Sequence, residues 1–218
     1  YIMAFPSVYE MTNPLTTVKK QHMWEYFTGK QLSVRRWKTT LSGGTVSMAD
    51  SANDGVKLSV AGVNYKATIS SGGDGNPAAR QFYHQNCTFI ASFKFDAGQA
   101  STIQAIGLSN GTTDSPRTYD YNTASISDVT NLGIYYVDHG DGSGAVVNTA
   151  TTDTVDTDWH TVKISLDSSS HITTTIDGNA IGSTITTDVP THRMAPIAHI
   201  DSGVTKNMYV NYMEVFNT

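Results

Sequence analysis

The stretch that decides the fold is Phe89-Ile90-Ala91-Ser92-Phe93-Lys94-Phe95. Successive side chains of an extended chain point to opposite sides, so the three phenylalanines and Ala91 share one face. Ser92 and Lys94 share the other face. This alternation predicts a β-strand that packs one face into a hydrophobic core.

A second run, His160-Thr161-Val162-Lys163-Ile164-Ser165-Leu166, repeats the pattern with its three aliphatic residues inward. A polar turn over residues 167–170 leads to a return segment from His171 to Ile176. Asp177-Gly178-Asn179 then makes another tight turn. Strands separated by such turn residues predict a β-hairpin.

Similar short runs recur along most of the chain, and no amphipathic helical stripe of useful length is present. We expect further strands at Val46–Met48, Val56–Val60, Lys66–Ile69, Thr102–Leu108, Leu132–Val137, Ala145–Thr149, Ile197–Ile200 and Met208–Phe216. The last run is apolar on both faces, which is typical of a central strand. Many short strands with frequent turns predict an all-β, two-sheet antiparallel jelly-roll β-sandwich.

The chain length suits a single domain, because sandwiches of about 200–250 residues do not split. Residues 1–17 carry Pro6 and Pro14 and lack the alternation. We therefore expect an extended N-terminal arm over residues 1–17 and a sandwich domain over residues 18–218. The arm packs along the domain or reaches a neighbouring subunit, which would make a homo-oligomer.

The charge balance excludes two classes of partner. The chain has 14 basic against 19 acidic residues and a net charge of −5. Such a chain has no basic footprint for nucleic acid. No run approaches the roughly 20 apolar residues that a membrane helix needs, so we expect no membrane insertion. The single cysteine, Cys87, excludes an intrachain disulfide and is expected to be buried.

Three segments resemble a known family. Trp24-Glu25-Tyr26-Phe27-Thr28-Gly29, followed by Trp37, resembles the opening of concanavalin A-like domains. The 158–164 run with Ile176-Asp177-Gly178 is similar to a hairpin of laminin-G-like modules. The closing run 209–215 resembles the final strand that lies beside the N-terminal one. The resemblance implies the concanavalin A-like lectin/glucanase fold, and the layout also resembles jelly-roll proteins of phage and virus particles.

The resemblance raises glycoside hydrolysis, which needs paired carboxylates. Glucanases of this fold carry them as Glu-x-Asp-x-x-Glu on one strand, and this sequence has no such triplet. Its only glutamates are Glu10, Glu25 and Glu214. Glu25 and Glu214 lie in strands that can be neighbours, but solitary acids usually mark solvated sheet faces.

Polysaccharide lyases of this fold offer a second comparison. They use Tyr and His to move a proton, while Arg and an amide neutralise a uronate carboxylate. The corresponding residue types here are Arg80, His84, Gln104 and Tyr135. The characteristic lyase runs around them are absent, so a polar edge with ordinary strand tyrosines is the favoured interpretation.

A calcium site is a further candidate, because Asp138-His139-Gly140-Asp141-Gly142-Ser143 offers two carboxylates and backbone carbonyls to a hard cation. Asp and Gly also favour turns without an ion, so a plain hairpin loop competes with this interpretation. We expect either no cofactor or a structural calcium ion at Asp138 and Asp141.

The best glycan-binding constellation is Arg117, Tyr119, Tyr121 and Asn122, in a long connection between the strands ending near Leu108 and beginning near Leu132. Tyr119 and Tyr121 face the same way if the segment is extended. The alternative is that these tyrosines only pin the connection to the sandwich. The tryptophans Trp24, Trp37 and Trp159 are expected in the core or covering a sheet.

We therefore expect a non-catalytic structural or adhesion module, located outside the cell or on a virion surface. Its partner is a glycan or a neighbouring structural subunit. The alternative is an enzyme of this fold, a polysaccharide lyase or glycoside hydrolase, that acts on an acidic polysaccharide.

Overall fold

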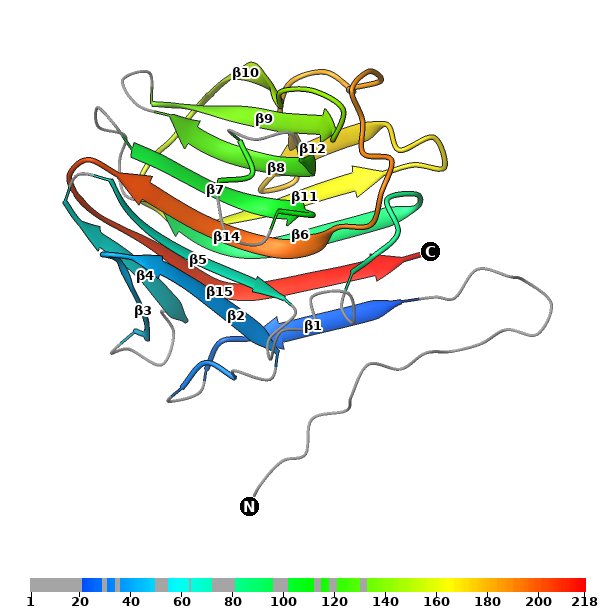
Figure 1. Cartoon of the computed structure of the whole chain (residues 1–218). Coiled ribbons are helices and arrows are strands. Elements are labelled where there is room, and N and C mark those ends of the chain that lie inside the picture. Colours follow the sequence, from blue (N-terminus) through cyan, green and yellow to red (C-terminus); the bar gives the residue numbers. More distant parts are fainter. Residues whose placement is uncertain are drawn as a thin grey trace.

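The computed structural model describes residues 21–28, 31–33, 36–49, 55–62, 64–71, 81–95, 102–111, 115–117, 121–129 and 133–218. Every regular element in these ranges is a β-strand, and the strands form two packed layers (Figure 1). The predicted all-β sandwich is confirmed. No helix in the same ranges could span a membrane. The predicted arm, residues 1–17, lies outside the described residues.

One layer is an eight-stranded antiparallel sheet. Its strands, in spatial order, are β13 (Asn179–Ala180), β12 (Ile172–Ile176), β11 (His160–Leu166), β6 (Cys87–Phe95), β15 (Thr205–Asn217), β4 (Val56–Ala61) and β3 (Thr45–Met48), and β1 (His22–Tyr26) also pairs with β15. The first and last strands of the described chain are therefore neighbours, as the resemblance implied.

The other layer is a seven-stranded antiparallel sheet. Its order is β10 (Val147–Thr154), β9 (Ile134–Asp141), β8 (Asn122–Val129), β7 (Thr102–Ser109), β14 (Ala195–Ser202), β5 (Tyr65–Ser71) and β2 (Trp37–Ser42). Part of each sheet follows chain order, as in β7 to β10 and β11 to β13. Elsewhere strands distant in sequence are neighbours, such as β6 with β15 and β7 with β14, so the chain crosses repeatedly between the layers (Figure 1).

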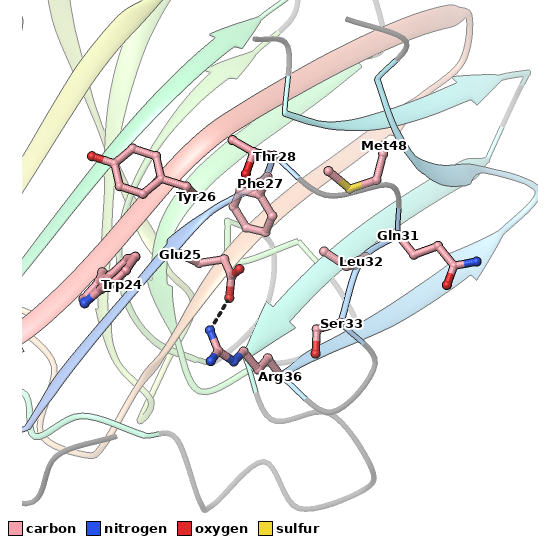
Figure 2. Close-up of a pocket in the computed structure, with 10 residues that line it drawn as sticks. All are labelled: Trp24, Glu25, Tyr26, Phe27, Thr28, Gln31, Leu32, Ser33, Arg36 and Met48. Atoms are coloured by element: carbon pink, nitrogen blue, oxygen red, sulfur yellow. Dashed lines mark hydrogen bonds and ion pairs between the residues drawn. The ribbon is translucent and has the colours of Figure 1, made fainter. Parts of the chain in front are cut away.

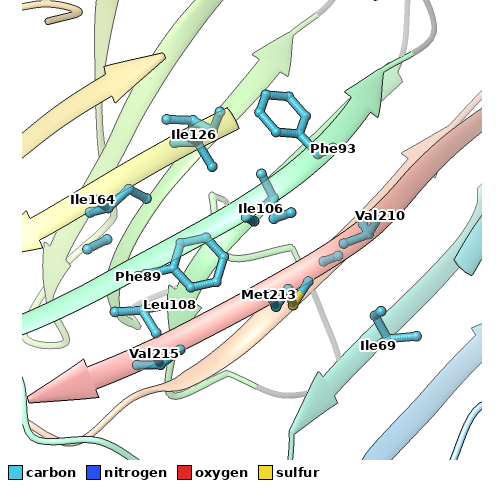
Figure 3. Close-up of a cluster of buried hydrophobic side chains, with 14 of the residues drawn as sticks. Ile69, Phe89, Phe93, Ile106, Leu108, Ile126, Ile164, Val210, Met213 and Val215 are labelled. Carbon is cyan, nitrogen blue, oxygen red and sulfur yellow. The ribbon is translucent and has the colours of Figure 1, made fainter. Parts of the chain in front are cut away.

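The core lies between the two sheets and follows the alternation in β6. The three phenylalanines of this strand and Ala91 are fully buried, while Ser92 and Lys94 are half-buried on the opposite face. Aliphatic side chains of β7, β8, β11 and β15 meet them from both layers (Figure 3). Cys87 is also fully buried, and burial raises the pKa of its thiol to about 12.

The strand β15 is central, as its two apolar faces predicted. It pairs with β6 along one edge, and on its other edge with β4 over its first half and β1 over its second half. The β6 ladder shifts register between Val210 and Tyr212, where a bulge interrupts the pairing. This extra residue lets Val210 and Met213 both face the core while Tyr209 and Tyr212 both face outward.

The predicted hairpin is formed by β11 and β12. The predicted Asp-Gly turn joins β12 to β13. Its residues Asp177 and Gly178 have φ angles of 50° and 83°, the two positive values that a type I′ turn requires. His160 is held by Asp177 Oδ2 at 2.7 Å from Nδ1 and by Asp156 Oδ1 at 2.8 Å from Nε2. It is a structural histidine with both ring nitrogens bonded.

Two strands were missed, β2 (Trp37–Ser42) at the edge of the seven-stranded sheet and β8 in its middle. The sequence analysis treated the segment between Leu108 and Leu132 as a connection, whereas residues Asn122–Val129 form β8 in the middle of a sheet. The prediction was wrong because, among the side chains of this run that the structure describes, only Ala124 and Ile126 are apolar core residues. Ser125 and Ser127 are buried on the opposite face, so the polar composition hid a strand that is covered on both sides.

Candidate ligand-binding surface on β1 and β15

The strand β1 presents aromatic side chains outward because the residues that alternate with them are buried in the core. Met23 is buried in the core, and so is Phe27, which follows the strand directly. Alternation then places Trp24 and Tyr26 on the outer face of the eight-stranded sheet. The register pairs Tyr26 with Tyr212 of β15, which carries another outward ring.

We call Trp24, Tyr26 and Tyr212 the aromatic patch. The Trp24 and Tyr26 rings have centroids 6.0 Å apart, and the Tyr26 and Tyr212 rings 4.5 Å apart. Trp24 and Tyr26 are 37% and 56% exposed, respectively. Three contiguous rings of which two are open to solvent form an apolar surface that the core does not use.

A carboxylate borders the aromatic patch. Glu214 is paired across the strands with Trp24. It accepts a hydrogen bond from the Tyr212 hydroxyl at 2.6 Å, and it lies 2.7 Å from Nε2 of His22. The pKa of Tyr212 is raised, mainly by partial burial and next by the hydrogen bond to Glu214. The patch thus combines ring faces with a hydroxyl, a carboxylate and an imidazole.

A pocket of about 470 Å³ opens beside the same strand (Figure 2). Its lining consists of Trp24, Glu25, Tyr26, Phe27, Thr28, Gln31, Leu32, Ser33, Arg36 and Met48. Glu25 and Arg36 point toward each other and form an ion pair of 2.9 Å. The apolar lining continues into the core through Phe27, whose ring lies 5.1 Å from that of Trp37.

The structure separates the two glutamates that it describes. They lie on neighbouring strands, but Glu25 is in register with Met213, whereas Glu214 is in register with Trp24. Because adjacent positions of a strand point to opposite faces, the two carboxylates project to opposite sides of the sheet. Each is engaged by its own partner, Arg36 or His22. The geometry does not bring them to one substrate.

The candidate lyase residues are also divided. Arg80 lies outside the described residues. His84 precedes β6, with its Nδ1 2.6 Å from Ser170 Oγ. Burial and then the nearby His192 lower the pKa of His84.

Gln104 and Tyr135 lie elsewhere, in one cross-strand row with Asp128 between them. This row faces the interior, because the next residues on the same faces belong to the core. Tyr135 packs edge-on against Phe93 at 6.3 Å, and burial raises the pKa of its hydroxyl. The structure therefore places two of the three described lyase candidates in one row, separated by Asp128, and leaves His84 apart.

Arg117 and Asp138, predicted for two separate sites, form one ion pair. Arg117 Nη1 lies 3.2 Å from Asp138 Oδ1 and donates to Ser127 Oγ at 2.9 Å, while the guanidinium stacks 4.4 Å from the Tyr136 ring centre. Asp138 is fully buried on the outer face of the seven-stranded sheet. Burial raises its pKa to about 7, although Arg117 acts in the opposite direction.

The remaining glycan candidates have different surroundings, and their role as a glycan site stays a prediction. Tyr119 lies outside the described residues, and Tyr121 is half-buried. Asn122 is buried, and its Oδ1 accepts hydrogen bonds from the backbone N–H groups of Thr191 and His192. Asn122 therefore fixes a neighbouring loop.

The two predicted calcium ligands differ in surroundings. Asp138 is committed to Arg117, while both carboxylate oxygens of the exposed Asp141 accept from Ser143 Oγ. No cluster of three or more metal-ligating side chains occurs in the described ranges. A shared calcium ion would require both aspartates to exchange these partners, and a neighbouring guanidinium opposes a cation. The calcium site stays a prediction.

Sequence reasoning missed the aromatic patch although it quoted the residues. Trp37 is buried as expected, whereas Trp24 and Trp159 are each exposed by more than a third. The alternation around Trp24 could have revealed the patch. If Met23 and Phe27 face the core, Trp24 and Tyr26 must face outward.

No protein-family model matches the sequence, and no curated protein matches it. Solved structures do match. A β-1,3-1,4-glucanase (lichenase) derived from a mouse hindgut metagenome has 12% identity and a TM-score of 0.66 over 90% of this chain and 98% of its own. Crh5 transglycosylase in complex with NAG has 14% identity and a TM-score of 0.65, over 90% and 84%. The Emp47p carbohydrate recognition domain has 12% identity and a TM-score of 0.63, over 90% and 94%. These likenesses show that the chain has the concanavalin A-like sandwich fold.

Proposed function

We propose that this chain is a non-catalytic carbohydrate-binding module whose ligand surface is the aromatic patch. The observation that carries the proposal is the exposure of Trp24 and Tyr26 in ring contact with Tyr212. A protein that only needed a stable sandwich would gain more by burying these rings.

The chemistry of the patch suits a sugar. A pyranose ring has an apolar face of C–H groups and an equatorial rim of hydroxyls. Aromatic rings cover the apolar face, while a few polar groups fix the orientation of the ligand. Glu214 and His22 supply such groups directly beside the rings.

The placement of the two described glutamates and of the buried Asp128 and Asp138 supports a non-catalytic role. Hydrolysis of a glycoside by two carboxylates requires both to face one bond. In the described part of the chain, Glu25 and Glu214 project to opposite faces, and Asp138 is buried in an ion pair. Asp128 is buried as well, between Gln104 and Tyr135 in the register.

The comparisons favour carbohydrate as the ligand class. By their names, one matched structure holds NAG and another is a carbohydrate recognition domain. We extend this ligand class to the present chain. Placement outside the cell or on a virion, and contact of residues 1–17 with a neighbouring subunit, stay predictions from the sequence.

The test is affinity electrophoresis against a panel of neutral and acidic polysaccharides, run alongside assays for reducing ends and for unsaturated uronates. We expect retardation by at least one polymer without product formation. Trp24→Ala and Tyr26→Ala should each raise the Kd for the retarding polymer about tenfold, because each removes roughly 1.4 kcal/mol of apolar contact.

The matched control is Tyr65→Ala. Tyr65 is 40% exposed, but it lies on β5 in the other sheet. Its removal should leave the Kd within twofold. Turnover of any polymer that is lost in His84→Ala would replace the module with the lyase alternative. Equal weakening by Tyr65→Ala and Tyr26→Ala would remove the aromatic patch as the ligand surface.

A further inference from the structure

The outer face of the eight-stranded sheet carries a second feature next to the aromatic patch. Tyr209 of β15 is in register with Lys57 of β4 on one side and with Lys94 of β6 on the other. The three side chains therefore form one row across the sheet. Both ammonium groups sit near the Tyr209 ring, at 5.8 Å and 6.0 Å from its centre.

These lysines are available to a ligand. Both side chains are half-buried on the outer face. Within the described residues, neither ammonium group has a carboxylate partner, and the tyrosine ring is the contact of each. A cation over an aromatic face is weakly held at an exposed site, so a carboxylate can add to the contact without breaking it.

The charge of this face is opposite to that of the molecule. The outward charged side chains of β4, β6, β11 and β15 are Lys57, Lys94, Lys163 and Glu214. Glu214 is already paired with His22. A face with three lysines in a chain of net charge −5 concentrates positive potential at one place.

The lysine row and the aromatic patch are continuous. Tyr209 and Tyr212 are three positions apart on the same strand, which is roughly 7–10 Å along β15. The bulge between them keeps both rings on the outer face. One extended polymer can thus cover the rings and reach both ammonium groups.

We infer that the ligand of this face is an anionic polysaccharide, whose acidic groups contact Lys57 and Lys94 while its sugar rings stack on Tyr209 and the aromatic patch. This inference rests on the proposed carbohydrate-binding function. Single-stranded nucleic acid also combines negative charge with stacking, but the inference keeps the carbohydrate class of the proposed function, and an oligothymidylate is the competing ligand in the test.

The test uses matched polymers. The Kd is measured by isothermal titration for a polyuronate, for the same polymer after reduction of its carboxyl groups, for a sulfated polysaccharide, and for an oligothymidylate. The proteins are the unaltered chain, Lys57→Gln, Lys94→Gln, the double variant, and Lys38→Gln on β2 of the other sheet as a control. Trp24→Ala is included to follow the aromatic patch separately.

We expect the polyuronate to bind more tightly than its reduced form. Each single lysine variant should weaken polyuronate binding about threefold, and the double variant about tenfold with a shallower salt dependence. Lys38→Gln should have no effect, and the reduced polymer should not distinguish the lysine variants. If the double variant loses binding of the sulfated polysaccharide alone, sulfate esters are the acidic groups, and the inference is still supported.

Two outcomes would overturn the inference. One is equal binding of polyuronate and reduced polymer that is weakened only by Trp24→Ala, which leaves the proposed function intact. The other is tighter binding of the oligothymidylate than of any polysaccharide. Failure of every polysaccharide to bind would instead overturn the proposed function itself.

Discussion

Asp138 shows at the scale of one residue how burial changes acid–base chemistry. Its carboxyl is fully buried on the outer face of the seven-stranded sheet, beside Arg117 and Ser125. Burial penalises the charged form more than the guanidinium favours it, so the pKa rises to about 7. The ordinary value of 3.8 applies to the unfolded chain.

The raised pKa makes stability depend on pH. Between pH 3.8 and about 7 the folded state binds more protons at Asp138 than the unfolded state does. Raising the pH through this window therefore lowers the free energy of unfolding. We expect Asp138→Asn to remove about 1–3 kcal/mol of the difference between pH 5 and pH 8, measured by urea denaturation.

Other groups also titrate, and the variant separates them. Asp128, with a pKa raised to about 6 by burial, and His160, whose pKa is also raised, act in the same direction, while the lowered pKa of His84 opposes them. All three groups are present in the unaltered protein and in Asp138→Asn, so their contributions to the pH dependence of stability cancel in the comparison. Asp141→Asn is the control, because the pKa of that exposed carboxyl is lowered and lies below the measured range. An unchanged pH difference in Asp138→Asn would contradict this account.

The same residue shows what the sequence leaves open. Arg117 and Asp138 were assigned to a glycan site and a calcium site, and the structure unites them in one ion pair. Arg117 Nη1 bonds Ser127 of β8 as well as Asp138 of β9, so the site depends on the register of β8 with β9. Register between strands is a long-range property, so residue types alone could not reveal the pair.

At the scale of elements, Gly55 leaves room for the backbone of β15 next to its bulge. A Cβ atom at this position would lie 2.1 Å from the carbonyl oxygen of Val210, and its φ of +67° is unfavourable for other residues. The adjacent Asn211 carbonyl accepts the Phe27 backbone N–H at 2.9 Å. The strand thus changes its neighbour from β4 to β1 at a point where only glycine fits.

We expect Gly55→Ala to lower the free energy of unfolding by about 3 kcal/mol or more, because backbone strain and a clash with backbone act together. The control is Gly178→Ala in the β12–β13 turn. Gly178 also has a positive φ, of +83°, but a Cβ atom added there would meet nothing within 4 Å. That variant should cost about 1 kcal/mol. Equal losses in urea denaturation would show that the approach of Gly55 to β15 is not as close as described.

Elements with strong alternation were predictable, and elements whose burial comes from neighbours were not. The strands β6 and β11 were identified because one face of each is apolar and the other polar. The strand β8 has serines on a buried outer face, and a polar run of this kind looks like a loop. The aromatic patch depends on the same principle, since the pairing of β1 with β15 brings Tyr26 to Tyr212.

The two outer faces differ at the scale of the whole molecule. On the seven-stranded sheet, Ser125, Ser127 and Asp138 are fully buried and bonded around Arg117. On the eight-stranded sheet, Trp24 and Tyr26 are open to solvent. The fold is shared with structures named as enzymes and as a sugar-recognition domain, so fold alone does not choose between these roles. The proposed role rests on the difference between the two faces.

The most direct test of this account is a titration of ¹⁵N-labelled protein with oligosaccharides of the polymer that it binds, observed at the three tryptophan indole N–H signals. The account predicts that the Trp24 signal shifts with the ligand concentration, together with the amides of Tyr26 and Tyr212. The signal of Trp37, buried in the core, should stay in place. Saturable shifts at Arg117 and Tyr136 with an unmoved Trp24 signal would contradict it, because the ligand would then lie on the opposite sheet.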